Sequence, residues 1–154
     1  MRSVSFVLIA FLLTGCASVI MPHYVTDKNP YKRRFDSQFA QTLEATKATL
    51  QEMGWAIKEE KDPGIYERAW KLEDPSIEHV LIFTEYNKSN FFVHSKNTVI
   101  NAYIRENKSG SCDVELRYLS VTTHFFKEFF TYRNDKLINK IYKSIEEKLQ
   151  KSET

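Results

Sequence analysis

A short run near the N-terminus, Leu13-Thr14-Gly15-Cys16, has the residue types and the order for a specific covalent chemistry. Arg2 gives the chain a positive start, and residues 4–13 form an apolar stretch broken only by Ser5. This is the layout of a secretory signal peptide whose cleavage site lies in front of a thiol. The stretch is too short for a bilayer-spanning helix, which needs about 20 apolar residues. We therefore expect residues 1–15 to be a cleaved signal peptide.

The same four residues resemble the lipobox of bacterial lipoprotein precursors. The resemblance implies that Leu13, Thr14 and Gly15 are recognised by a dedicated signal peptidase, and that the thiol of Cys16 carries lipid. A protein with two or more acyl chains is stably anchored to a membrane. As in enterobacteria-like sorting, Ala17 after the cysteine favours the outer membrane over the inner one, with the domain facing the periplasm. The alternative is an ordinary signal peptide cleaved near a cysteine.

The rest of the chain contains no motif that is typical of catalysis or metal binding. Its glycines are scattered, whereas a phosphate-binding loop needs several close together. The four histidines are far apart in sequence, and neither HExxH nor CxxC occurs. His79 and His94 could approach each other on neighbouring strands, although half-exposed strand histidines are the simpler interpretation. Cys112 lies in an alternating apolar row, which predicts a core thiol rather than a nucleophile. We expect no catalytic residue, no metal and no cofactor.

Residues 124–133 are densely aromatic and allow two interpretations. Phe125, Phe126, Phe129 and Phe130 recur at i, i+1, i+4 and i+5. If they are exposed, they form a patch for a partner or a membrane interface. The alternative is that they seal the sheet before the last helix.

The 154 residues carry a net charge of +2, which argues against general nucleic-acid binding. Residues 16–35 contain two prolines, a polar cluster and a basic run at 32–34, so we expect a lipidated N-terminus followed by a flexible tether. The remaining residues, 36–154, are enough for one domain.

Helical periodicity predicts helices at 36–53, capped by Asp36 or Ser37, and at 134–150, capped by Asn134 or Asp135. Between them, strand patterns cover 55–60, 65–72, 80–86, 98–106 and 112–121, with a hairpin loop at 107–111 and a break at 87–90. The expected fold is α+β. An antiparallel sheet of about four to five strands would carry the N-terminal and C-terminal helices on one face.

This order of elements resembles the helix-grip-like domains of small envelope lipoproteins, including accessory lipoproteins of outer-membrane protein assembly. Together, the lipobox and the lack of any catalytic motif predict a non-catalytic lipoprotein, anchored to the membrane through Cys16, that binds another envelope component, expected to be a protein. Two alternatives remain. One is a lipoprotein that holds a lipid or a small apolar ligand between sheet and helices, and the other is a periplasmic hydrolase with polar groups around His79 or His94.

Overall fold

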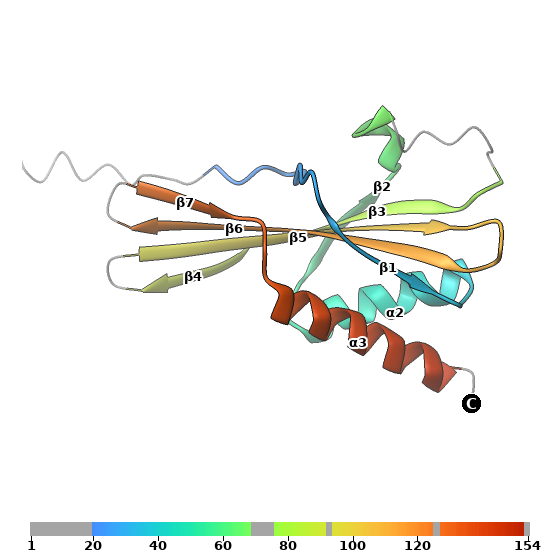
Figure 1. Ribbon diagram of the computed structural model, residues 1–154. Coiled ribbons are helices and arrows are strands. Elements are labelled where there is room, and N and C mark those ends of the chain that lie inside the picture. Colours follow the sequence, from blue (N-terminus) through green and yellow to red (C-terminus); the bar gives the residue numbers. More distant parts are fainter. Residues whose placement is uncertain (1–19, 69–75, 92–93, 125–126, 153–154) are drawn as a thin grey trace, which may run out of the picture.

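The computed structural model describes residues 20–68, 76–91, 94–124 and 127–152. Over these residues the fold is α+β, with a seven-stranded antiparallel sheet and two helices (Figure 1). The helices are α2 (Phe39–Glu52) and α3 (Asp135–Ser152), and a 3-10 turn, η1, covers Pro63–Ile65. The strands are β1 (Tyr31–Phe35), β2 (Ile57–Lys61), β3 (His79–Thr84), β4 (Asn87–Phe91), β5 (His94–Glu106), β6 (Cys112–His124) and β7 (Lys127–Thr131).

The centre of the sheet is the long hairpin of β5 and β6, each 13 residues long. Two strands share each outer edge of this hairpin: β1 and β7 pair with β6, and β3 and β4 pair with β5. One part, which we call the body, has the strand order β1-β6-β5-β3-β2. The other part, which we call the arm, consists of β4, β7 and the segments of β5 and β6 that pair with them, residues 94–98 and 120–124.

Both helices cover one face of the body, as expected (Figure 1). The apolar stripe of α3, with Ile138 and Ile145 fully buried, faces strand residues such as Ile100 and Leu116. Burial of each such side chain contributes about 1.5–3 kcal/mol. Cys112 is also fully buried in this layer, which confirms its predicted place in the core.

The ends of the helices agree in part with the sequence analysis. Gly54 follows α2 with a φ of 83°, a left-handed conformation that glycine adopts without strain. The Asn134 side chain accepts a hydrogen bond from the Leu137 amide at 3.2 Å and caps α3. The caps expected at Asp36 or Ser37 are wrong, because α2 begins at Phe39 and no side chain caps it.

The predicted number of strands is too low. β1 lies where the tether was expected, and β4 lies where a break was expected. Both are short edge strands held by backbone pairing, so they need no apolar alternation to form. Residues 65–68, expected to begin a strand, instead form the end of η1 and the turn after it, and 69–75 lie outside the described residues.

Residues 20–30, which we call the N-terminal segment, are also not a free tether. They cross the sheet face opposite the helices (Figure 1). Met21 and Val25 are buried against Val99, Leu119 and Val121 of β5 and β6. The sheet is therefore covered on both faces of its body, by helices on one side and by this segment and η1 on the other.

Candidate functional site

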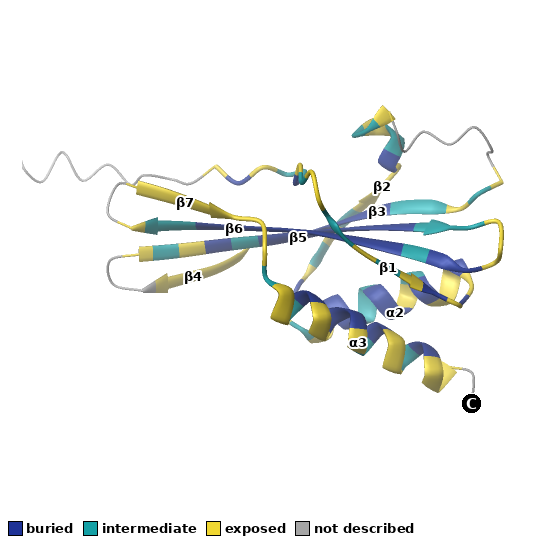
Figure 2. Cartoon of the chain, viewed as in Figure 1, coloured by how far each residue is buried: buried dark blue, intermediate teal, exposed yellow. Residues whose placement is uncertain are grey.

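The predicted aromatic patch is exposed where the structure describes it. Phe129 and Phe130 lie on β7, with side chains about half exposed, and all five residues of that strand are exposed (Figure 2). Phe125 and Phe126 lie outside the described residues, as does Leu13-Thr14-Gly15-Cys16. The interpretation in which Phe129 and Phe130 seal the sheet is therefore wrong.

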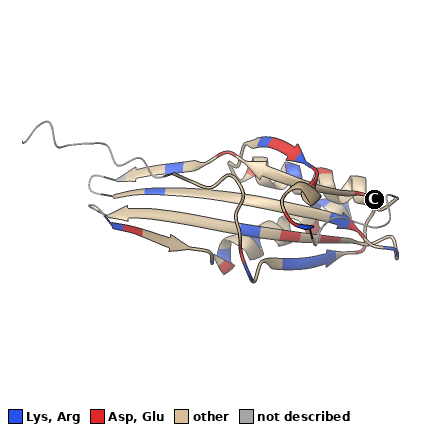
Figure 3. Ribbon diagram, turned by 90° about the horizontal axis from the view of Figure 1, so that it is seen from above, with Lys and Arg blue, Asp and Glu red and all other residues tan. Residues whose placement is uncertain are grey.

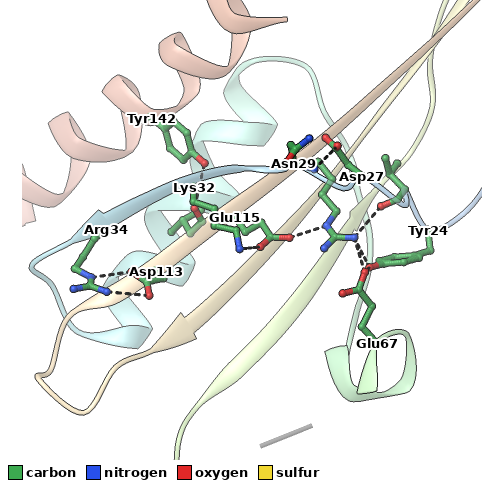
Figure 4. Close-up of polar contacts among 12 residues, drawn as sticks. Tyr24, Asp27, Asn29, Lys32, Arg34, Glu67, Asp113, Glu115 and Tyr142 are labelled. Carbon is green, nitrogen blue, oxygen red and sulfur yellow. Dashed lines mark hydrogen bonds and ion pairs between the residues drawn. The ribbon is translucent and has the colours of Figure 1, made fainter. Parts of the chain in front are cut away.

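A buried ionic network is the main feature that sequence reasoning missed (Figure 4). Arg117 of β6 is only 4% exposed and Glu115 only 5%. The Arg117 Nε donates to Glu115 Oε1 at 2.7 Å, and its Nη1 donates to Glu67 Oε1 at 2.8 Å. The Tyr24 hydroxyl donates to Glu67 and accepts from Arg117. The network joins the N-terminal segment and the turn after η1 to the centre of the sheet.

The strand alternation explains why this network is buried. Cys112, Val114 and Leu116 point to the helices, so Glu115 and Arg117 point to the opposite face. Sequence analysis left that face without a cover because residues 20–30 were expected to be flexible. The apolar Leu119 and Val121 on the same face of β6 were the signal that something covers it.

Backbone groups of the N-terminal segment are bound to the same face. The Val25 amide donates to Asn101 Oδ1 at 2.6 Å, and the Val25 carbonyl accepts from Arg117 at 3.3 Å. The His23 ring stacks on Phe83 with centroids 4.1 Å apart. Buried polar groups need such partners, since an unsatisfied one costs about 1–3 kcal/mol.

The pKa shifts in the network follow from burial and hydrogen bonding. Burial acts to raise the pKa of Glu67, but hydrogen bonds from Tyr24 and Arg117 outweigh it and hold that pKa below its usual value. Burial and the hydrogen bond to Glu67 raise the pKa of the Tyr24 phenol. The network therefore holds a carboxylate and a neutral phenol around Arg117 at neutral pH.

An open hollow of about 520 Å³ lies beside the network, at the body end of β6. The carboxylates of Glu115 and Asp113 face the basic residues of β1, with Lys32 Nζ 3.1 Å from Glu115 and Arg34 Nε 2.9 Å from Asp113 (Figure 4). The Arg34 hydrogen bond is the largest reason why the pKa of Asp113 is lowered. The full lining is Lys32, Arg33, Arg34, Tyr103, Arg105, Asp113, Val114 and Glu115.

The lining presents three cationic side chains, Lys32, Arg34 and Arg105, with two carboxylates, so its net positive charge can attract an acidic group. Arg33 also belongs to the lining, but its guanidinium lies over the Tyr142 ring on the helix face. Burial raises the pKa of Tyr103 to about 12, so its hydroxyl stays protonated and adds no negative charge. In the sequence, residues 32–34 are only a basic run. In the structure they form part of a defined hollow, because β1 pairs with β6 and brings Lys32 and Arg34 to the carboxylates of Glu115 and Asp113.

The histidines do not come together as the hydrolase alternative requires. His79 lies opposite Arg105, and His94 is eleven residues from Arg105 on β5, or about 37 Å. His94 instead faces His124 across the arm, with ring centroids 6.4 Å apart. Among the described residues, no group of three or more His, Cys, Asp or Glu side chains could hold a metal ion.

The alternative function would hold a lipid or a small apolar ligand between the sheet and the helices. Side chains fill this layer. Leu50, Ile82, Ile100 and Ile141 all have no exposed surface in this layer. A second hollow of about 440 Å³ lies at the arm end of the helices, and its lining includes the polar residues Asn87, Ser89 and Lys96 together with Trp55 and Leu137.

No protein-family model matches the chain, and a search of curated proteins returns no match. Within the described residues, no helix combines the length and apolar character needed to cross a bilayer.

Proposed function

We propose that this chain is a lipid-anchored lipoprotein of the cell envelope that works by binding another envelope component and not by catalysis. The lipid would be carried by Cys16, after removal of residues 1–15, and Ala17 favours the outer membrane with the domain in the periplasm. The observation that supports binding most directly is the cationic hollow over β1, β5 and β6.

The position of the hollow fits this role. Asp113 lines the hollow, and Val121 belongs to the buried cluster that contains Met21. The two residues are eight positions apart on β6, or about 27 Å. The hollow is therefore well separated from the point where the chain leads back to Cys16. A partner that binds there would meet the end of the domain farther from the anchor, and its binding groups would be acidic.

Lipidation is tested by metabolic labelling with a fatty-acid probe, comparing the wild type with Cys16→Ala. We expect the label on the wild type alone, because alanine has no thiol to which the lipid can be attached. Equal labelling of both would refute the anchor at this residue.

Binding at the hollow is tested by site-specific photo-crosslinking in intact cells. A photoreactive amino acid replaces Lys32, at the rim of the hollow, or Lys143, an exposed lysine of α3, as the matched control. We expect a discrete adduct from position 32 that is absent at position 143, and weaker when Arg105→Glu reverses a charge in the lining. No adduct at position 32, or the same adduct at both positions, would contradict the proposal.

A further inference from the structure

The arm is a second surface that the binding role of the hollow does not use. Neither helix extends over it in Figure 1, and it ends the sheet on the side from which the N-terminal segment enters. Its outer strand β7 is exposed along its whole length, whereas in the paired part of β6, residues 120–124, only Ser120 and Val121 are buried. We propose that the arm rests on the anionic phospholipid surface to which Cys16 is anchored, with the β7 edge in the headgroup region.

The apolar part of this surface is the edge of β7. Phe129 lies opposite Thr122 and Phe130 opposite Val121, so the two rings point to opposite faces of the arm. They are 49% and 53% exposed. An edge with an aromatic ring on each side can enter the interface between headgroups and acyl chains, where aromatic residues are enriched in membrane proteins. The Lys127 ammonium lies 5.4 Å from the centre of the Phe129 ring, which places a cation beside the apolar edge.

The charges of the arm favour an anionic surface. Among its described residues, Lys88, Lys96 and Lys127 are exposed, and Glu128 is the one acidic side chain. In Figure 3 the arm strands are long tan stretches with few charged positions, whereas blue and red lie close together in the body. Lysines close to an anionic membrane are attracted to its headgroups.

The length of chain before the N-terminal segment limits how far the arm can be from the lipid. This step rests on the proposed anchor at Cys16. Met21 belongs to the same buried cluster as Val121, which is the residue paired with Phe130. Cys16 is five residues before Met21, so the lipid-bearing sulfur lies within about 18 Å of it even in a fully extended chain. The exposed edge of β7 is thereby held close to the bilayer.

A second copy of this chain is the competing occupant, because an exposed edge strand can pair with another strand. The membrane fits the observations better: three lysines on each copy would repel one another, and the same lysines attract anionic headgroups.

The test uses the mature lipidated protein, purified from membranes and reconstituted into vesicles of phosphatidylethanolamine and phosphatidylglycerol. Phe129→Trp places a fluorescent probe on the β7 edge. Ile65→Trp is the matched control, since Ile65 is an exposed apolar residue of η1 in the body. We expect lipids with brominated acyl chains to quench the added fluorescence of Trp at 129 and leave that at 65 unchanged. Lys127→Gln should lower the ratio of docked to undocked arm about fivefold, the equivalent of about 1 kcal/mol.

The outcomes separate the two proposals. If the protein stays in the vesicles and Trp at 129 is not quenched, the arm does not dock and the inference is overturned while the anchor stands. A β7-to-β7 cross-link between copies that protects Trp at 129 would also overturn it. If the protein is not retained by the vesicles, the anchor is refuted. The inference is then overturned too, because the proposed position of the arm depends on the lipid at Cys16.

Discussion

At the scale of single residues, the most consequential group is the Arg117 guanidinium. It is buried together with Glu115, and it contacts three elements at once: β6, the turn after η1 and the N-terminal segment. A buried ion pair does not by itself stabilise a fold, because desolvation opposes the attraction between the charges. Removing one partner is different, since the remaining buried charge then loses its most buried counter-ion.

We therefore expect Arg117→Met to destabilise the protein by about 3 kcal/mol. Methionine fills a similar volume but leaves Glu115 with Lys32 as its remaining ionic partner. Arg34→Met is the control, because Arg34 and Asp113 form an exposed pair on the same sheet and should contribute less than about 1 kcal/mol. Urea unfolding of both variants gives the comparison. Equal losses would mean that burial of the Arg117 pair does not matter for stability.

At the scale of elements, the N-terminal segment joins the anchor region to the sheet. It has no regular secondary structure, so its backbone groups depend on side chains of the sheet for their hydrogen bonds. Asn101 is the central partner: its oxygen accepts from the Val25 amide, and its Nδ2 donates to the His23 carbonyl at 3.4 Å. The Asn101 side chain therefore binds the segment at two residues, His23 and Val25.

Asn101→Leu should loosen this segment without unfolding the sheet. Loss of the acceptor costs about 1–3 kcal/mol, so we expect hydrogen exchange at the Val25 amide to be about 5- to 150-fold faster. Asn97→Leu is the control, because Asn97 lies on the same face of β5 and makes no described hydrogen bond to the segment. Unchanged exchange at Val25 in the Asn101 variant would show that the segment is held by its apolar contacts alone.

The elements also show which structure was predictable from sequence. The stripe of α3, the hairpin loop at 107–111 and the apolar row of β6 come from local periodicity, and the structure confirms them. The strands β1 and β7 have no such pattern. β1 pairs through backbone atoms with residues more than 75 positions away, and β7 pairs with β6 as an exposed edge strand. Pairing of this kind depends on the whole sheet and not on local sequence.

The same reasoning applies to the candidate sites. Phe129 and Phe130 were found because aromatic residues are conspicuous in sequence, but their exposure depends on β7 being an edge strand. For Glu115 and Arg117, strand alternation indicates only that they lie on the face opposite the apolar row. Only the path of the N-terminal segment across that face makes them buried.

At the scale of the whole molecule, carboxylates link the N-terminal segment and β1 to the rest of the sheet. Glu67 binds Tyr24 and Arg117, and Asp113 binds Arg34, and both carboxyls have a pKa below the usual value. A lowered folded-state pKa means that the folded state binds fewer protons than the unfolded chain. Stability is then fully present above the unfolded pKa, about 4, and is lost as pH falls through the folded pKa.

We accordingly expect the free energy of unfolding to decline below about pH 4, and Glu67→Gln to weaken that decline. The glutamine side chain keeps a hydrogen-bonding group beside Tyr24 and Arg117 but has no proton to gain in this range. Glu147→Gln removes one carboxylate from the exposed side of α3 and serves as the control. Urea titrations between pH 2 and pH 7, a range set by the ordinary carboxyl pKa values, measure the slopes. If the Glu67 variant and the control keep the wild-type slope, the acid sensitivity arises elsewhere than at the contact between Glu67, Tyr24 and Arg117.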